Sequence, residues 1–170
     1  GSQAIGTTSR GIGPSYEDKA GRRGIRIADL SDGATSERLM ALLNSNVLTR
    51  NAVVNGAVMS AETLRTELAL VWTRLAPMVT DTAALLHTAL AAKTNILFEG
   101  AQGAMLDIDH GTFPYVTSSN STIGGVCTGL GVGPQAIEAV LGIVKAYTTR
   151  VGAGPLPTEL TDTAGDQLRE

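Results

Sequence analysis

The stretch from residue 95 to residue 120 constrains the fold of this sequence more than any other. It begins with a short apolar run at residues 96–98, turns at Gly-Ala-Gln-Gly (100–103), and ends in a polar loop. A short apolar run that is bounded by glycines predicts a buried strand. Ligands of open α/β sheets bind beyond the carboxyl ends of the strands, so Glu99 and Gln102, the two polar residues just past this run, are candidate ligand contacts.

The remaining periodicities predict helices around a second strand. Apolar residues at three-and-four spacing predict helices at about 35–51, at 61–75, and from beyond Pro77 to about residue 93. Pro14 favours the start of a shorter helix that ends near Gly24, and Pro134 favours another short one. Residues 140–151 are rich in β-branched and aromatic residues, which predicts a long strand, whereas the glycine-rich residues 121–133 predict a loop. Together these elements predict an α/β fold.

Composition limits the class of protein. The 170 residues, of which 43% are hydrophobic and 17% charged, suffice for one core, and the net charge of -3 argues against a nucleic-acid partner. No apolar run reaches the roughly 18 residues of a membrane span. The single cysteine, Cys127, and the lack of a leader favour a cytoplasmic protein. The Gly-Ser start is typical of a cloning scar and the polar tail looks unfinished, so we expect a central fragment.

Residues 4–13 combine glycines and hydroxyls with Arg10, a composition that suits an anion. No Gly-Lys-Ser/Thr follows at P-loop spacing, and a solvated surface loop is the alternative. In the following helix Lys19, Arg22 and Arg23 share one side. That basic face either pairs with the neighbouring acidic residues, Glu17 and Asp18, or captures phosphate.

Two further groups of residues carry candidate chemistry. Asp107, Asp109 and His110 could ligate a metal, but in an extended segment the histidine points away from the two carboxylates, so supporting hydrogen bonds are favoured. The hydroxyl-rich run at 117–122 could donate to phosphate oxygens or form a turn. Cys127 has no basic neighbour, which favours a small buried side chain over a reactive thiol.

Four separated segments, residues 5–19, 98–103, 106–120 and 145–155, resemble the adenylosuccinate synthetase family in sequence, order and spacing. The resemblance implies a ligase of purine biosynthesis that makes adenylosuccinate from GTP, IMP and L-aspartate. This reaction is the first committed step of AMP formation from IMP. It also implies a larger, P-loop-NTPase-related α/β fold with a mostly parallel sheet and flanking helices. The expected organisation is a phosphate and dimer-interface segment (3–33), a helical block (34–94), strands with IMP-site loops (95–155) and a truncated tail (156–170).

The resemblance also implies roles for individual residues. Gln102 would lie beside the purine 6-position as the catalytic donor, and Arg22 would reach the IMP of the partner subunit across a homodimer. The 6-oxygen develops negative charge when GTP phosphorylates it, so a nearby amide donor has a physical purpose. Arg10 and Lys19 would give support. The implied IMP contacts are Thr8, Arg22, Gln102, Leu106, Thr117 and Val151.

Other family features do not occur in this sequence. The Gly-Asp-Glu-Gly-Lys-Gly-Lys loop that holds phosphates and Mg²⁺, with the catalytic aspartate and histidine, is not among these residues. The family's aspartate loop and guanine segment are also missing, and His110 does not match the catalytic histidine. We therefore expect an IMP half-site and dimer surface without the GTP and Mg²⁺ sites, inactive alone. The alternative is a non-catalytic nucleotide-binding or dimerisation module.

Overall fold

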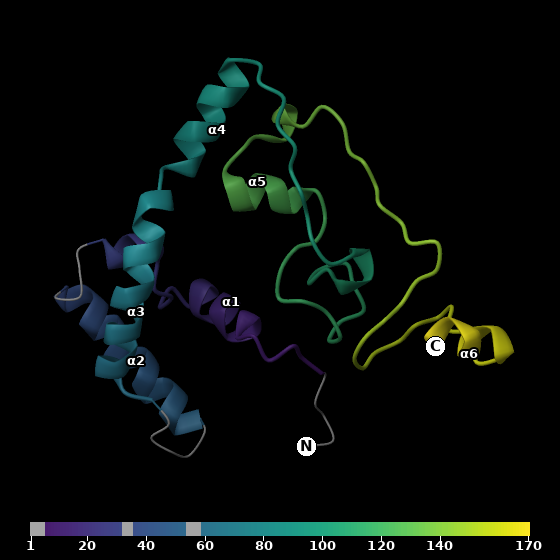
Figure 1. Ribbon diagram of the computed structural model, residues 1–170, viewed down its shortest axis with the longest axis horizontal. Coiled ribbons are helices and arrows are strands. Elements are labelled where there is room, and N and C mark those ends of the chain that lie inside the picture. The colour runs from purple at the N-terminus through teal and green to yellow at the C-terminus, as the bar shows by residue number, and fades with distance from the viewer. Residues whose placement is uncertain (1–5, 32–35, 54–58) are drawn as a thin grey trace. The chain divides into compact units, whose positions relative to one another are not determined.

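The computed structural model describes residues 6–31, 36–53 and 59–170 of the chain (Figure 1). These residues fall into two compact units. We call Gly13–Leu85 the helical unit, and we call the residues up to Ile12 together with Leu86–Glu170 the loop unit.

The helices predicted from leucine spacing are confirmed. Helix α3 has the predicted bounds, and its first turn is capped by Ser60, whose Oγ accepts the Thr63 N–H at 3.1 Å. Pro77 lies in the 3-10 turn that follows α3, where a missing N–H ends the helix. The elements of this part of the chain are α1 (Ile12–Ala20), η1 (Ile27–Leu30), α2 (Glu37–Val53), α3 (Ala61–Leu75), η2 (Ala76–Met78) and α4 (Thr82–Ala91).

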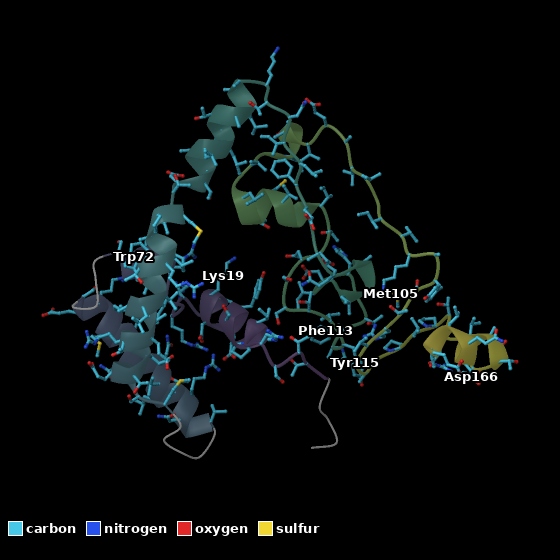
Figure 2. All side chains as sticks on the ribbon, viewed as in Figure 1. Lys19, Trp72, Met105, Phe113, Tyr115 and Asp166 are labelled. Atoms are coloured by element: carbon cyan, nitrogen blue, oxygen red, sulfur yellow. The ribbon has the colours of Figure 1, made fainter. Side chains whose placement is uncertain are left out.

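The core of the helical unit lies between α2 and α3. Leu39 and Leu43, one turn apart on α2, are each 2% exposed, and Leu30 and Ala61 complete the buried cluster. Trp72 on α3 packs against this cluster with part of its surface exposed (Figure 2). Burial of one apolar stripe of each helix, rather than helix propensity alone, therefore stabilises the pair.

The loop unit has short helices joined by long irregular segments. They are η3 (Ala104–Leu106), α5 (Gly124–Leu130), η4 (Pro134–Ala136) and α6 (Thr163–Arg169). The prediction of a loop throughout residues 121–133 is wrong for α5, which carries the free, partly buried Cys127. Glycine has a steric reason here, because a Cβ on Gly125 would come within 2.9 Å of the Asn120 carbonyl oxygen.

The two predicted strands do not form. Residues 96–98 and 140–151 follow extended paths without a partner (Figure 1), and the described residues contain no strand, so within them the predicted α/β sheet is replaced by helices and loops. Leu97, Leu141 and Ile143 are 92%, 88% and 91% exposed. The physical reason is that a strand needs a neighbour for its N–H and C=O groups, which an apolar run cannot supply for itself.

The structure also bears on the predicted absence of a membrane span. Within residues 6–31, 36–53 and 59–170, no helix combines the length and the apolar character needed to cross a bilayer.

Candidate functional site

A buried carboxylate organises the loop that follows Gln102. Asp107 is fully buried, and its Oδ1 accepts the backbone N–H groups of Asp109 at 2.9 Å and His110 at 3.0 Å. Its Oδ2 accepts those of Ser121 at 2.7 Å and Thr122 at 3.3 Å. Burial opposes ionisation, but the four N–H groups outweigh it and lower the pKa of Asp107 to about 2. The carboxylate therefore closes residues 107–122 into one ordered loop.

These contacts leave the two aspartates without the geometry of a metal site. Both oxygens of Asp107 are occupied by backbone N–H groups, and Asp109 Oδ2 accepts from the Asn120 side-chain amide at 2.6 Å. Across the described part of the chain, no group of three or more His, Cys, Asp or Glu residues could hold a metal ion. The side chains of Asp107 and Asp109 instead make the supporting hydrogen bonds that the sequence favoured, and the described residues do not fit Mg²⁺.

The same loop brings three predicted IMP residues together. The Thr117 N–H donates to the Leu106 carbonyl oxygen at 2.8 Å, so these two residues are neighbours. Ser121 Oγ donates to the Gly103 carbonyl oxygen at 2.9 Å, which ties the far end of the loop to the residue after Gln102. Gln102 has a φ of 64° and an exposed side chain. A non-glycine residue in this left-handed region is uncommon and is typical of functional turns.

Arg150 joins the segment of Val151 to this loop. Its Nη2 donates to the Tyr115 carbonyl oxygen at 2.8 Å, and its Nη1 donates to Thr112 Oγ1 at 3.3 Å. Its Nε donates to the Ala153 carbonyl oxygen at 3.3 Å. The side chain of Val151, beside it in sequence, is 99% exposed. Tyr115 lies two residues before Thr117, so one guanidinium fixes the predicted ribose and phosphate segments to each other.

The segment of Thr8 reaches the same turn. A Cβ on Gly6 would lie 3.5 Å from the Ala153 backbone nitrogen and 3.7 Å from Gly152 Cα, which is ordinary van der Waals contact. Thr8 and Arg10 are exposed in the adjoining residues. The loop unit thus brings the segments of Thr8, Gln102, Leu106, Thr117 and Val151 together.

Arg22 and Lys19 belong to the helical unit. Arg22, whose N–H donates to the Lys19 carbonyl oxygen at 3.1 Å, has a φ of 59° and an exposed side chain. Lys19 Nζ lies 5.7 Å from the centroid of the Tyr16 ring, at cation–π distance. In the part of the chain that the structure describes, neither basic side chain makes an ion pair.

Arg23, the neighbour of Arg22, pairs with the acidic residues instead. Arg23 Nε and Arg50 Nη2 both donate to Asp18 Oδ1 at 2.9 Å, and Arg23 Nη2 donates to Glu17 Oε1 at 2.8 Å. These contacts fix the end of α1 to α2. The pairing interpretation of the basic face is therefore correct for Arg23, whereas Arg22 is left exposed and phosphate capture by Arg22 stays a prediction.

Sequence reasoning missed Arg150 and Gly154. Arg150 lies in a predicted strand, where its contacts with residues 35 and 38 positions earlier leave no local pattern. Gly154 has a φ of 117°, and a Cβ there would overlap Arg150 Nη2 and come within 2.6 Å of Tyr115 Cβ. The Gly-Ala-Gly motif was the available signal, since glycine often marks a close approach of two chain segments.

Comparison with known proteins places this geometry in a family. The family model described as adenylosuccinate synthetase matches residues 1–170. The chain is 52% identical over 171 residues to the adenylosuccinate synthetase of Solibacter usitatus (strain Ellin6076), covering 100% of this chain and 39% of the relative. It is 53% identical over 173 residues to that of Xylella fastidiosa (strain M12), covering 100% of this chain and 40% of the relative.

A solved structure agrees with the sequence comparison. The fully ligated adenylosuccinate synthetase from Plasmodium falciparum superposes with a TM-score of 0.88 at 39% identity, covering 99% of this chain and 39% of that protein. The chain thus spans about two fifths of the length of the relatives it matches. The four segments that carry the resemblance all lie within the matched region, and the chain belongs to the adenylosuccinate synthetase family.

Proposed function

We propose that this chain supplies the IMP half-site and dimer surface of an adenylosuccinate synthetase. The reaction is GTP, IMP and L-aspartate giving GDP, phosphate and adenylosuccinate. The observation that carries the proposal is the assembly of the loop unit, where Asp107 and Arg150 join the segments of Gln102, Thr117 and Val151. The family match over residues 1–170 supplies the chemistry that such an assembly would serve.

In this proposal each IMP contact has a physical task. The hydroxyls of Thr8 and Thr117 donate to the phosphate of IMP, and Val151 packs its exposed apolar side chain against the ribose. Leu106 lines the pocket beside Thr117. The Gln102 amide donates to the purine 6-oxygen as it becomes negatively charged and is phosphorylated, which lowers the energy of that transition state.

The basic residues of the helical unit would serve the dimer. Arg22 is exposed and makes no ion pair within the described residues, so its guanidinium is available to reach the IMP of a second subunit. Arg10 and Lys19 support the phosphate or the interface. The segments 3–33, 34–94 and 95–155 would act as phosphate and dimer segment, helical block and IMP-site segment, ahead of the tail at 156–170.

GTP and Mg²⁺ would act through the remainder of a complete synthetase. The described residues offer no cluster that fits Mg²⁺, and no step of the proposed chemistry is assigned to the metal in this chain. We therefore propose that the 170 residues alone form no adenylosuccinate. Residues 96–98 and 140–151 would become strands of the family's α/β sheet once neighbouring strands are present.

Calorimetric titration tests the IMP half-site. The chain should bind IMP and should not bind GTP, and Thr117→Ala or Arg22→Ala should weaken IMP binding. Thr66→Ala, an exposed threonine of α3 remote in sequence from every predicted contact, is the matched control. A folded chain that binds no IMP would contradict the proposal and favour a structural or dimerisation module, which sedimentation of the same sample would detect. An enzymatic assay that finds adenylosuccinate would refute the predicted inactivity.

A further inference from the structure

Arg150 differs from the other half-buried arginines of the described residues in what it contacts. Among the described residues its guanidinium donates only to neutral oxygens, which are the carbonyls of Tyr115 and Ala153 and the hydroxyl of Thr112. Arg23 and Arg50, by contrast, both face the carboxylate of Asp18. No ion pair involves Arg150 within residues 6–31, 36–53 and 59–170.

Because no carboxylate of the described residues pairs with Arg150, the positive charge of its guanidinium is not neutralised by a neighbouring side chain. The guanidinium of the half-buried Arg150 makes four hydrogen bonds to neutral oxygens, and within the described residues its positive charge has no anionic partner. Charged groups that lose water are normally paired, and a cation with neutral partners raises the local positive potential. Because Arg150 bonds to the residue two before Thr117, that potential lies beside the loop that carries the predicted phosphate contact.

The backbone is shaped to hold this side chain. Gly154 adopts a φ of 117°, and a Cβ at this position would overlap Arg150 Nη2 and come within 2.8 Å of the Tyr115 ring carbon Cγ. The absence of a side chain at residue 154 therefore makes the room that the guanidinium and Tyr115 occupy. Neighbouring Gly152, with a φ of 90°, has nothing within 4 Å of the corresponding position.

We infer that Arg150 is a positioning residue that fixes the Thr117 loop against the Val151 turn and, through its unpaired charge, makes the site prefer a nucleoside monophosphate to the nucleoside. This inference rests on the proposed IMP half-site. Thr8 and Thr117 would bring uncharged donors to the phosphate, and Arg150 would supply the positive potential that two hydroxyls lack. Arg150 would act on the phosphate through this potential, without a direct contact.

The test compares IMP with inosine, which lacks only the phosphate, by calorimetry on the wild-type chain and on Arg150→Gln and Arg150→Lys. In Arg150→Gln the preference for IMP over inosine should fall by about tenfold, as expected when a partly buried site loses a unit positive charge near the phosphate. Arg150→Lys keeps the charge and should recover part of that preference. Arg169→Gln removes a loop-unit arginine that faces carboxylates, and it should leave the preference unchanged.

A purely structural role predicts a different pattern, in which IMP and inosine lose affinity by the same factor and lysine gives no recovery. That result would overturn the inferred preference. Hydrogen exchange of residues 112–117 supplies an independent measurement, because Arg150→Gln should speed exchange there if Arg150 fixes the loop, and unchanged exchange would overturn the positioning role. A wild-type chain that binds neither ligand contradicts the proposed function and the preference, while the exchange result still decides the positioning role.

Discussion

The carboxylate of Asp107 accepts the backbone N–H of Ser121, fourteen positions further along the chain, at 2.7 Å. The other carboxylate oxygen holds the N–H groups of Asp109 and His110. One fully buried side chain thus closes the loop in which Thr117 bonds to Leu106. The loop needs little regular secondary structure because its N–H groups find a charged acceptor instead.

The stability that Asp107 contributes should depend on pH. Its pKa in the folded chain is about 2, below the ordinary value of 3.8, so the contribution is complete above about pH 4 and is lost as the pH falls towards 2. Asp107→Asn should melt at a lower temperature than wild type at pH 6, and the difference should shrink below pH 3. Asp109→Asn, which alters an exposed carboxylate with one side-chain partner, is the control. If the melting-temperature difference between wild type and Asp107→Asn stayed constant from pH 6 to pH 2, the stabilising role of the Asp107 carboxylate would be contradicted.

Substitution of Gly154 should be far more damaging than substitution of Gly152. Both glycines have positive φ values, 117° and 90°, so alanine strains the backbone at either by roughly 1–2 kcal/mol. Only at Gly154 would the new methyl group also meet Arg150 and Tyr115. Gly154→Ala should therefore lower both the melting temperature and the affinity for IMP beyond Gly152→Ala. Equal effects in a paired thermal melt and titration would argue against the close packing.

Substitution by alanine should destabilise the helical unit strongly at Leu43 and little at Leu48. Both lie on α2, but Leu43 is 2% exposed and Leu48 is 74% exposed. Leu43→Ala should lower the free energy of unfolding by about 2–5 kcal/mol, through lost burial and a residual cavity. Leu48→Ala should change it by about 0.5 kcal/mol or less. Urea unfolding followed by circular dichroism measures both, and similar losses would mean that α2 presents another face to α3.

The contact between α1 and α2 should depend on Asp18. Its carboxylate accepts from both Arg23 and Arg50, so Asp18→Asn should lower the free energy of unfolding by about 1 kcal/mol, a value reduced by partial solvent exposure. Glu62→Gln, which breaks an exposed ion pair with Arg65 inside α3, should have a much smaller effect on the free energy of unfolding. In 1 M NaCl the difference between the two variants in the free energy of unfolding should become smaller, because salt screens both ion pairs. A larger effect of Glu62→Gln than of Asp18→Asn would contradict the role of Asp18 in holding α1 against α2.

The unpaired extended segment should behave as exposed apolar chain. Leu141, Ile143 and Val144 are 88%, 91% and 87% exposed, so the isolated chain should bind a hydrophobic dye, and Leu141→Glu should weaken the fluorescence. In a complete synthetase the amides of residues 140–151 should exchange much more slowly, because neighbouring strands would supply acceptors. Thr73→Glu on α3 is a control for added charge. Equal exchange in the two contexts would rule out the proposed strand.

Much of the helical unit and the family could be predicted from the sequence. The spacing of the leucines predicts α2 and α3 because an amphipathic stripe is a local property. The four resembling segments identified the family because motif order and spacing survive without knowledge of contacts. They also named Gln102, Thr117 and Val151, whose roles remain predictions.

Only the tertiary structure decided which partners each arginine contacts. Arg22 and Arg23 are adjacent and chemically identical, yet Arg23 pairs with Asp18 while Arg22 is exposed, because one backbone turn aims their side chains differently. Arg150 acquires its role from residues more than thirty positions away. The apolar run at 140–151 has the residues of a strand but lacks a partner, since composition sets a tendency to extend and only a second chain segment can satisfy the backbone.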